Sequence, residues 1–420
     1  MTSTEAILKK RGMYLALFCL INFFTGIIYA WSVFSSALVP HLNTFGPETP
    51  VTMATLGSVF GLATAMTPIT MLVGGYINDR FGPKKIIMVG GLCLAVGYLT
   101  SALATSVSTL YLTYGLFAGA GTGLVNGCTI NSAVKFFPDK RGFAGGLVTA
   151  CLGVGGALIP FAANALIAQV GIVNTLFVIA CVLGCVIVGA AIPLIPCPSE
   201  LAQAFAPKET LRSTVNTDYS WKEMIGSPRF YPLFALFAIA STMGLMMISN
   251  ISGIAKTQIG MNTALAALSV SALSLANTSG RFLSGTLSDK LGRIQMLTLI
   301  LLVAMGGLGL LYFAGEGDTL AFFTGIVGVG LCYGAFFGTY PGLVADEFGL
   351  KNNSVNFSVM AFAYSIGGFA GPLIIRSVSA QGNYSTAYLL ALGLALLGLL
   401  CAVWFIAMKR KMQLKTILVD

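Results

Sequence analysis

The stretch GYINDRFGPKK at residues 75–85 decides the fold, because it returns as GTLSDKLGR at residues 285–293. Both copies place a glycine four residues before an aspartate, a basic residue directly after it, and a second glycine three residues after it. Each copy follows the second long apolar run of its half of the chain. A polar loop that recurs at matching positions predicts two halves built on one plan.

Outward from these loops we count twelve apolar runs, each long enough to cross a bilayer. We therefore predict an all-α membrane protein with twelve transmembrane helices in two pseudo-symmetric six-helix bundles. The predicted domains are an N-terminal bundle (1–195), a cytoplasmic central loop (196–229), and a C-terminal bundle with a cytoplasmic tail (230–420). The predicted spans are 13–39, 55–77, 86–105, 108–134, 142–168, 172–195, 230–254, 263–288, 293–314, 319–345, 353–379 and 384–408.

The composition excludes a soluble protein. Of the 420 residues, 56% are hydrophobic and only 9% are charged, with a mean hydropathy of +0.87; no soluble domain of this size hides so much apolar surface. The N-terminus resembles a signal peptide, but its apolar stretch is too long, so we interpret it as a retained first span. The nine cysteines and one histidine form no zinc or disulfide pattern, and we expect no metal and no cofactor.

The basic residues predict the orientation in the membrane. When loops are assigned to alternating sides, 20 of the 23 lysines and arginines fall on one side. Because positive charge collects in cytoplasmic loops, both termini are expected in the cytoplasm of a multi-pass protein of the cell (plasma or inner) membrane. The net charge of +9 therefore indicates membrane topology and not a nucleic-acid partner.

Arg281 is the one charged side chain inside the long apolar runs. An unpaired guanidinium in hydrocarbon costs at least roughly 2.5–3.5 kcal/mol, so it is expected to face a cavity or a partner. The alternative is an arginine that extends to the membrane surface. Small and polar residues recur at helical spacing with it: Ser271, Ser274, Asn277, Ser284, Gly285 and Ser288.

The doubled loop resembles the signature of the major facilitator superfamily. Four further stretches resemble the oxalate/formate antiporter family and its bacterial monocarboxylate-transporter relatives: YAWS (29–32), NSAVKFFPDKRG (131–142), NTSGR (277–281), and Tyr340-Pro341 followed by Phe348-Gly349. The resemblance covers nearly the whole chain except the termini and the central loop. It implies a transporter of the rocking-bundle type with a central carboxylate site.

The resemblance also implies the residues of that site. The arginine that meets the substrate carboxylate falls on Arg281, with Asn277 one turn earlier. The aromatic pocket positions fall on Tyr29 and Trp31 in the first span and on Tyr333 and Phe337 in the tenth, and Phe336 is a further candidate for an apolar wall. Two positions depart from the oxalate carrier: Tyr364 replaces a lysine and Asn126 replaces a tyrosine. Loss of that lysine favours a substrate with one carboxylate over one with two.

The repeated loops supply candidate gating residues: Asp79, Arg80, Asp289, Lys290 and Arg293. One interpretation is a solvated salt bridge between each aspartate and its neighbour, which contributes little. The resemblance implies instead a cytoplasmic latch against neighbouring helix ends, broken when the transporter opens inward. Because the loop occurs twice, we favour the latch.

We therefore predict a secondary active transporter, and not an enzyme, for a small monocarboxylate of the lactate or pyruvate class. All fourteen acidic residues fall in tails, loops or span ends, so two mechanisms stay open: symport with a proton, which we favour, and exchange for a counter-anion. A carboxylate sensor of transporter-like fold is the alternative from another class. The lipid bilayer is the other expected partner, and the resemblance implies a monomer.

Overall fold

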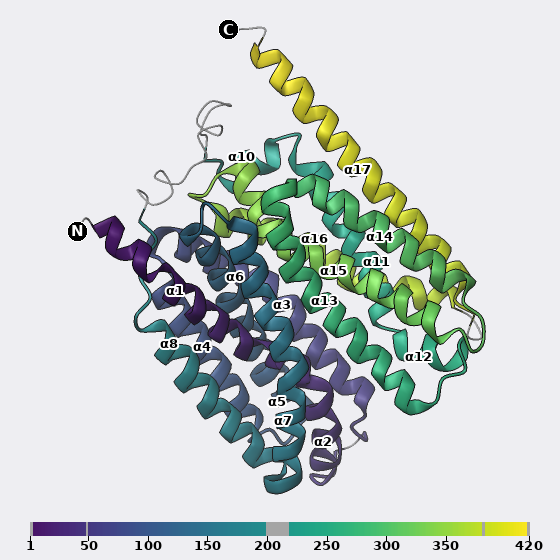
Figure 1. The fold of residues 1–420 in the computed structure, drawn as a ribbon. Helices are drawn as coiled ribbons and strands as arrows, with labels where there is room; N and C mark the ends of the chain where they lie inside the picture. Colours follow the sequence, from purple (N-terminus) through teal and green to yellow (C-terminus); the bar gives the residue numbers. More distant parts are fainter. Residues whose placement is uncertain (1–2, 48, 199–217, 380–382, 418–420) are drawn as a thin grey trace. The chain divides into compact units, whose positions relative to one another are not determined.

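The computed structural model describes residues 3–47, 49–198, 218–379 and 383–417. Within these ranges every regular element is a helix (Figure 1). The chain forms two compact units, which are described separately. Unit 1 comprises Met1–Pro138, Cys151–Phe205 and Asn352–Val359, and unit 2 comprises Asp139–Ala150, Ala206–Lys351 and Met360–Asp420.

The helices of the first half are amphipathic only weakly, because most of their faces are apolar, as expected for helices in a membrane. α3 packs on α6. α4 packs on α6 and on the π-helical segment directly before α6. These elements are α1 (Ser3–Thr25), the 3₁₀ turn η1 (Gly26–Ala30), α2 (Trp31–Asn43), α3 (Met53–Phe81), α4 (Pro83–Ser101), α5 (Val107–Leu110), the π-helical η2 (Tyr111–Ala118), α6 (Gly119–Phe136), α7 (Arg141–Leu183), the π-helical η3 (Gly184–Val188) and α8 (Gly189–Ala191).

In the second half, α13 packs on α15, α14 packs on α15, and α11 packs on α17. Short polar or glycine-containing connections separate these helices, and Asn262 caps α13 by accepting a hydrogen bond from the Leu265 N–H. The elements are α10 (Trp221–Gly226), α11 (Phe230–Ile248), α12 (Ile251–Thr257), α13 (Thr263–Leu291), α14 (Arg293–Phe313), α15 (Thr319–Phe348), α16 (Asn353–Val378) and α17 (Ser385–Ile417).

Nine helices in the described ranges are apolar and long enough to span a membrane. One of them, Arg141–Ala191, is two spans joined at Gly171, whose φ of 77° is not helical. Two further helices have spanning length but carry more polar or small residues: Val107–Phe136 and Thr263–Leu291. Helices of the described ranges thus cover the twelve predicted spans of a multi-pass all-α membrane protein.

Two of the predicted spans are interrupted. The first is continuous in sequence, but η1 separates α1 from α2 at Gly26, where an added Cβ would lie 2.5 Å from the Leu152 carbonyl oxygen. The span predicted at 230–254 breaks after α11, because Asn250 leaves the helical region with φ −127° and ψ 5°. Close backbone contact at Gly26 and the non-helical backbone of Asn250 interrupt the apolar runs at these two places.

Two helices change unit along their length. α7 begins in unit 2, and from Cys151 onward it belongs to unit 1. α16 begins in unit 1 and continues in unit 2 from Met360. The division into two bundles at residues 195 and 230 remains a prediction. The two units differ from it at the start of α7 and at the start of α16. Each of these helix starts packs against helices from the opposite half of the sequence.

Candidate functional site

Arg281, on α13, lies inside unit 2. Arg281 is only 4% exposed. Its Nε donates a hydrogen bond to Oδ1 of Asn277 at 3.0 Å, and its Nη1 donates one to the backbone carbonyl of Thr149 at 3.2 Å. An arginine that reached the membrane surface would keep its guanidinium in water. The structure therefore favours the interpretation of Arg281 as an internal, positioned cation.

Glycines on α15 let its backbone touch that of α13 beside Arg281. A Cβ added at Gly334 would lie 1.9 Å from the Asn277 carbonyl oxygen, and one added at Gly338 would lie 2.0 Å from the Arg281 carbonyl oxygen. No larger residue fits these positions without moving a helix. The contact brings the aromatic residues of α15 next to the arginine.

Three aromatic rings form a connected set around the guanidinium. The Phe337 ring centroid lies 4.9 Å from Cζ of Arg281. Tyr333, one turn earlier on α15, packs on Phe337 with centroids 5.2 Å apart, and Tyr364 from α16 meets Phe337 edge-on at 5.1 Å. Unit 2 thus brings together five predicted site residues: Arg281, Asn277, Tyr333, Phe337 and Tyr364.

Phe336 does not join this set. Its ring stacks on Phe237 and Tyr340, with centroids 6.4 and 5.7 Å away, and the residue is only 1% exposed. Neighbouring positions on a helix point about 100° apart, so Phe336 and Phe337 face different sides of α15. Phe336 packs against α11, and its place in the site wall stays a prediction.

The charge of Arg281 is not cancelled by a carboxylate among the residues that the structure describes. Its two hydrogen-bond acceptors are an amide oxygen and a backbone carbonyl, and both are neutral. The Phe337 ring adds a cation–π contact, which also carries no net charge. These partners orient the guanidinium and leave its positive charge available, which suits an anion with two oxygens.

Unit 1 holds the other three predicted binding residues, and they differ in their surroundings. Trp31 is 6% exposed, donates from Nε1 to the Leu56 carbonyl at 3.2 Å, and stacks on Tyr114 at 4.0 Å. These contacts hold its ring in the packing of unit 1, and its role as a pocket wall stays a prediction. Tyr29 is 46% exposed, and Oδ1 of Asn126 is buried without a hydrogen-bond partner.

The first predicted gating carboxylate lies at a helix start. Oδ1 and Oδ2 of Asp79 accept hydrogen bonds from the backbone N–H groups of Ser354 and Val355, at 3.3 and 3.1 Å, at the beginning of α16. Lys135 donates to Oδ1 at 2.5 Å.

Burial raises the pKa of the neighbouring Cys197 thiol to about 12, with Lys135 opposing the shift, so this thiol is protonated at neutral pH.

The second carboxylate repeats the arrangement in unit 2. Asp289 accepts hydrogen bonds from the N–H groups of Gly142 and Phe143, at 2.9 and 2.8 Å, at the start of α7. Arg293 pairs with it at 2.7 Å. Both aspartates thus cap the N-terminus of a helix, where a negative charge is favoured by the free N–H groups and the helix dipole.

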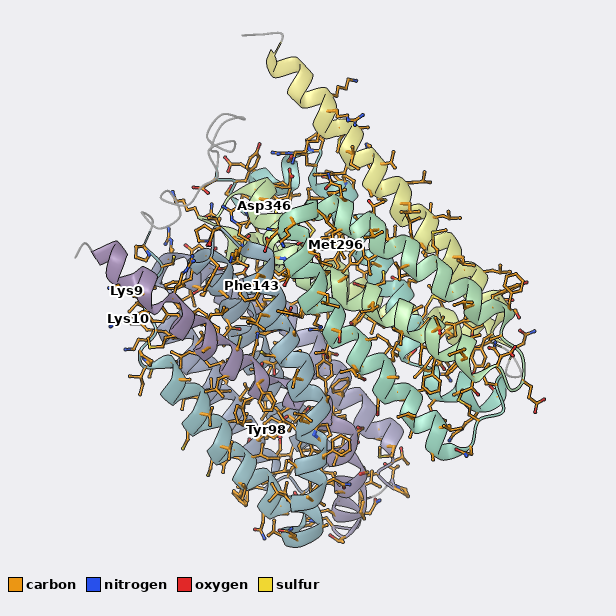
Figure 2. All side chains as sticks on the ribbon, viewed as in Figure 1. Lys9, Lys10, Tyr98, Phe143, Met296 and Asp346 are labelled. Atoms are coloured by element: carbon orange, nitrogen blue, oxygen red, sulfur yellow. The ribbon has the colours of Figure 1, made fainter. Side chains whose placement is uncertain are left out.

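The basic residues that follow the two aspartates in sequence differ in their contacts. Arg80 lies over the ring of Tyr76 at 4.9 Å and Lys290 is exposed, so neither contributes to the contacts of the aspartates. Arg293 does contribute, and its Nε also donates to Asp346 at 2.8 Å, which in turn accepts from Arg141 at 2.7 Å. Figure 2 labels Asp346.

Sequence reasoning missed two partners of the site. Thr149 was not expected, because a backbone carbonyl carries no signal in the side-chain pattern. Lys135 lies in the 131–142 motif, and nothing in that pattern assigns it a partner. Pairing it with Asp79 requires the packing of α3 against α6.

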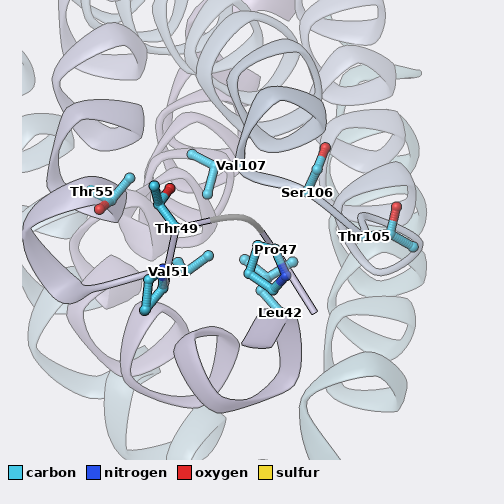
Figure 3. Close-up of a pocket in the computed structure, with 9 residues that line it drawn as sticks. Leu42, Pro47, Thr49, Val51, Thr55, Thr105, Ser106 and Val107 are labelled. Atoms are coloured by element: carbon cyan, nitrogen blue, oxygen red, sulfur yellow. The ribbon is translucent and has the colours of Figure 1, made fainter. Parts of the chain in front are cut away.

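A pocket in unit 1 is separate from these residues. It is lined by the connections before α3 and α5, with a volume of about 200 Å³, and it carries hydroxyl and apolar side chains but no charge (Figure 3). Ligand pockets usually measure roughly 300–1,000 Å³ and hold convergent polar groups. None of the predicted site residues lines it.

Comparison with known proteins identifies relatives over most of the chain. The model of the Major Facilitator Superfamily matches residues 15–372. The chain is 29% identical over 349 residues to the uncharacterised MFS-type transporter YhjX of Escherichia coli, covering 82% of this chain and 83% of that protein. It is 26% identical over 391 residues to the oxalate:formate antiporter of Oxalobacter formigenes, covering 92% and 89%.

A mammalian relative and a solved structure agree with this. Monocarboxylate transporter 11 of Mus musculus is 25% identical over 359 residues, covering 81% of this chain and 76% of that protein. The crystal structure of the E. coli fucose:proton symporter FucP is similar with a TM-score of 0.70 at 17% identity, covering 94% of this chain and 99% of that one. The latter likeness concerns the fold alone.

Proposed function

Because the chain belongs to the Major Facilitator Superfamily, we propose that it is a secondary active transporter of a small monocarboxylate, of the lactate or pyruvate class, working by alternating access. Arg281 binds the substrate carboxylate in this proposal. The relatives named for oxalate and formate or for monocarboxylates support an organic anion as the substrate class.

The observation that carries the proposal is the buried guanidinium of Arg281 with only neutral acceptors. Leaving a charge buried without a counter-charge is costly, and a bound anion relieves that cost. Arginine suits a carboxylate because its planar fork donates two parallel hydrogen bonds and keeps its charge. Binding a monoanion would neutralise the site and favour its closure around the substrate.

The surroundings of Arg281 favour one carboxylate and a small apolar group. Phe337 and Tyr333 present ring faces and edges, which suit a methyl group. Tyr364 stands where the resemblance to the oxalate carrier implies a lysine, and its ring packs on Phe337. Asn277 holds Nε of Arg281, so its role in this proposal is to orient the arginine and not to bind substrate directly.

The two capped helix starts support a gating role for Asp79 and Asp289. We place both termini and both repeated loops in the cytoplasm of a cell-membrane protein, as the distribution of basic residues indicates. Each carboxylate then holds a helix start at the cytoplasmic end, and losing these caps is one cost of opening toward the cytoplasm. Arg293 supports this latch through Asp346.

Anion exchange of the oxalate/formate type is the second candidate function. The specific observation in its favour is the match to the oxalate:formate antiporter over 92% of this chain. The two candidates differ in what drives uptake: symport needs a proton gradient, whereas exchange needs a second anion on the opposite side of the membrane.

The direct test is uptake of labelled L-lactate into proteoliposomes by the wild-type protein and by Arg281→Lys. Lysine keeps the charge but cannot form the bidentate contact. Losing one hydrogen bond to a charged group costs roughly 1.5–3 kcal/mol, which is about a ten- to hundredfold loss of affinity.

The matched control is Arg376→Lys, which changes an exposed arginine on α16 and is expected to leave uptake unchanged. Near-normal uptake by folded Arg281→Lys protein would remove Arg281 from the mechanism. Absence of uptake by the wild-type protein for lactate, pyruvate and formate alike would contradict the monocarboxylate function.

A further inference from the structure

The first ten residues of α7 are docked on α13 in successive layers. At the bottom, Asp289 caps the helix through the N–H groups of Gly142 and Phe143. Above this the two backbones touch: a Cβ added at Gly285 would lie 2.3 Å from the Gly142 carbonyl oxygen, and one added at Gly146 would lie 2.6 Å from the Arg281 carbonyl oxygen. The close approach of the two backbones in these layers depends on glycine.

The uppermost layer is the hydrogen bond from Arg281 Nη1 to the Thr149 carbonyl. The Thr149 hydroxyl turns back to the carbonyls of Gly145 and Gly146, at 2.9 and 3.0 Å, which is a pattern that bends helices. Thr149 is the last residue but one before α7 passes from unit 2 into unit 1. The guanidinium therefore holds α7 at the point where the helix leaves α13.

The donors of Arg281 are already partly committed. A guanidinium offers five N–H groups, and a carboxylate can bind it bidentately along the edge that joins Nε to Nη2 or along the edge that joins Nη1 to Nη2. Asn277 occupies Nε. The remaining edge includes Nη1, where the Thr149 carbonyl is bound. A bidentate carboxylate on this edge therefore has to bind the same Nη1 that donates to the Thr149 carbonyl.

We propose that Arg281 is a substrate-sensitive tether: in the empty protein it holds α7 through the Thr149 carbonyl, and a bound carboxylate takes that bond away and loosens the start of α7 from α13. This rests on the proposed function for its substrate, but the tether itself does not. Thr149 becomes a positioning residue that makes helix release depend on occupancy of the arginine.

The tether is tested first without substrate, by hydrogen exchange of peptides that cover residues 142–150. Arg281→Met removes the donor and is expected to speed exchange there several-fold, whereas Arg376→Met, the matched control on α16, leaves it unchanged. Arg281→Lys keeps a donor and is expected to restore part of the protection. Unchanged exchange in folded Arg281→Met protein overturns the tether.

The competition is tested with L-lactate, with binding measured separately by calorimetry. Lactate is expected to speed exchange of residues 142–150 in the wild-type protein. Lactate that binds without this change overturns the competition and leaves the transport function standing. Failure of lactate, pyruvate and formate to bind overturns both the competition and the monocarboxylate function, while the exchange result for Arg281→Met still decides the tether.

A backbone change separates competition from a merely structural contact. Replacing Ala150 by its α-hydroxy analogue turns the Thr149 carbonyl into an ester carbonyl, which is a weaker acceptor. The Thr149 carbonyl then competes less well with the lactate carboxylate for Nη1 of Arg281, so lactate affinity is expected to rise several-fold. If the contact were purely structural, lactate affinity would fall or stay unchanged. The same replacement at Ala180, in the unit 1 part of α7, is the control for the lost N–H group.

Discussion

At the residue scale, charge and shape are supplied by different side chains. Arg281 provides the cation, Asn277 and Thr149 hold two of its nitrogens, and Phe337 covers its face. Tyr364 packs edge-on against Phe337 and provides a hydroxyl where a second cation would favour a second carboxylate. Substrate charge should therefore depend on Tyr364, and affinity for a single carboxylate on Arg281.

Tyr364→Lys is expected to shift preference toward dicarboxylates. A second cation beside Arg281 supplies a second ion pair for a substrate such as oxalate, and charge-assisted hydrogen bonds are worth roughly 1.5–3 kcal/mol, so oxalate should compete with lactate about ten- to a hundredfold better. Competition by unlabelled oxalate against lactate uptake measures this. Tyr364→Met, of similar length and without charge, is the control. Unchanged oxalate competition in Tyr364→Lys would contradict this account of the missing cation.

At the element scale, the position of Arg281 depends on how closely helices approach. α13 contacts α15 through Gly334 and Gly338, and it contacts the start of α7 through Gly285. These distances are set by backbone, so small increases in side-chain volume are expected to move whole helices. Caps at helix starts add a second, electrostatic control on the same elements.

Gly338→Ala is expected to lower both thermal stability and lactate uptake. Its Cβ would lie 2.0 Å from the Arg281 carbonyl oxygen, so α13 and α15 must separate, and overpacking of this kind costs about 1–3 kcal/mol. Gly306→Ala on α14 is the control, because an added Cβ there meets nothing within 4 Å. A Gly338→Ala protein with wild-type melting temperature and uptake would show that this contact does not position the arginine.

The two caps are expected to act on separate helices. Asp289→Asn keeps an acceptor but loses the charge, so exchange should rise at residues 142–150, and Asp79→Asn should do the same at residues 354–360. Caps and helix-dipole contacts contribute about 0.5–2 kcal/mol, which corresponds to roughly two- to thirtyfold in local opening. Hydrogen exchange measures both, and each variant is the control for the other. Equal effects on both segments would contradict independent caps.

At the scale of the whole molecule, the sequence predicts the helices well and their contacts poorly. Membrane spans are predictable because a bilayer demands long apolar runs, and the Gly171 joint falls between the predicted spans at 142–168 and 172–195. The interruption at Asn250 was not predicted, because the apolar run continues through it. An apolar run gives no signal for a break that consists of one residue leaving the helical backbone conformation.

The candidate site shows the same limit. Arg281 was predictable, since one charge in apolar sequence is conspicuous, and the resemblance placed Asn277, Tyr333, Phe337 and Tyr364 in its surroundings. Trp31 and Phe336 stay predictions as pocket walls: their rings pack on Tyr114 and Phe237, and an aromatic residue at helical spacing has the same pattern in a core as in a site. The Thr149 carbonyl depends on α7 meeting α13, which no local pattern encodes.

The charges of the whole molecule lead to the last prediction, on energy coupling. The described carboxylates that make ion pairs lie at helix ends or in loops, and none of them bonds to Arg281. We therefore expect a coupled proton to travel with the substrate, as the neutral acid or paired with it in the site. An inside-alkaline gradient is then expected to drive L-lactate uptake into empty proteoliposomes, and collapsing the gradient with a protonophore should abolish the accumulation. Vesicles without protein control for diffusion of the neutral acid. Uptake that needs internal unlabelled anion and ignores the pH gradient would instead establish exchange, with Arg281 neutralised by one anion on each passage.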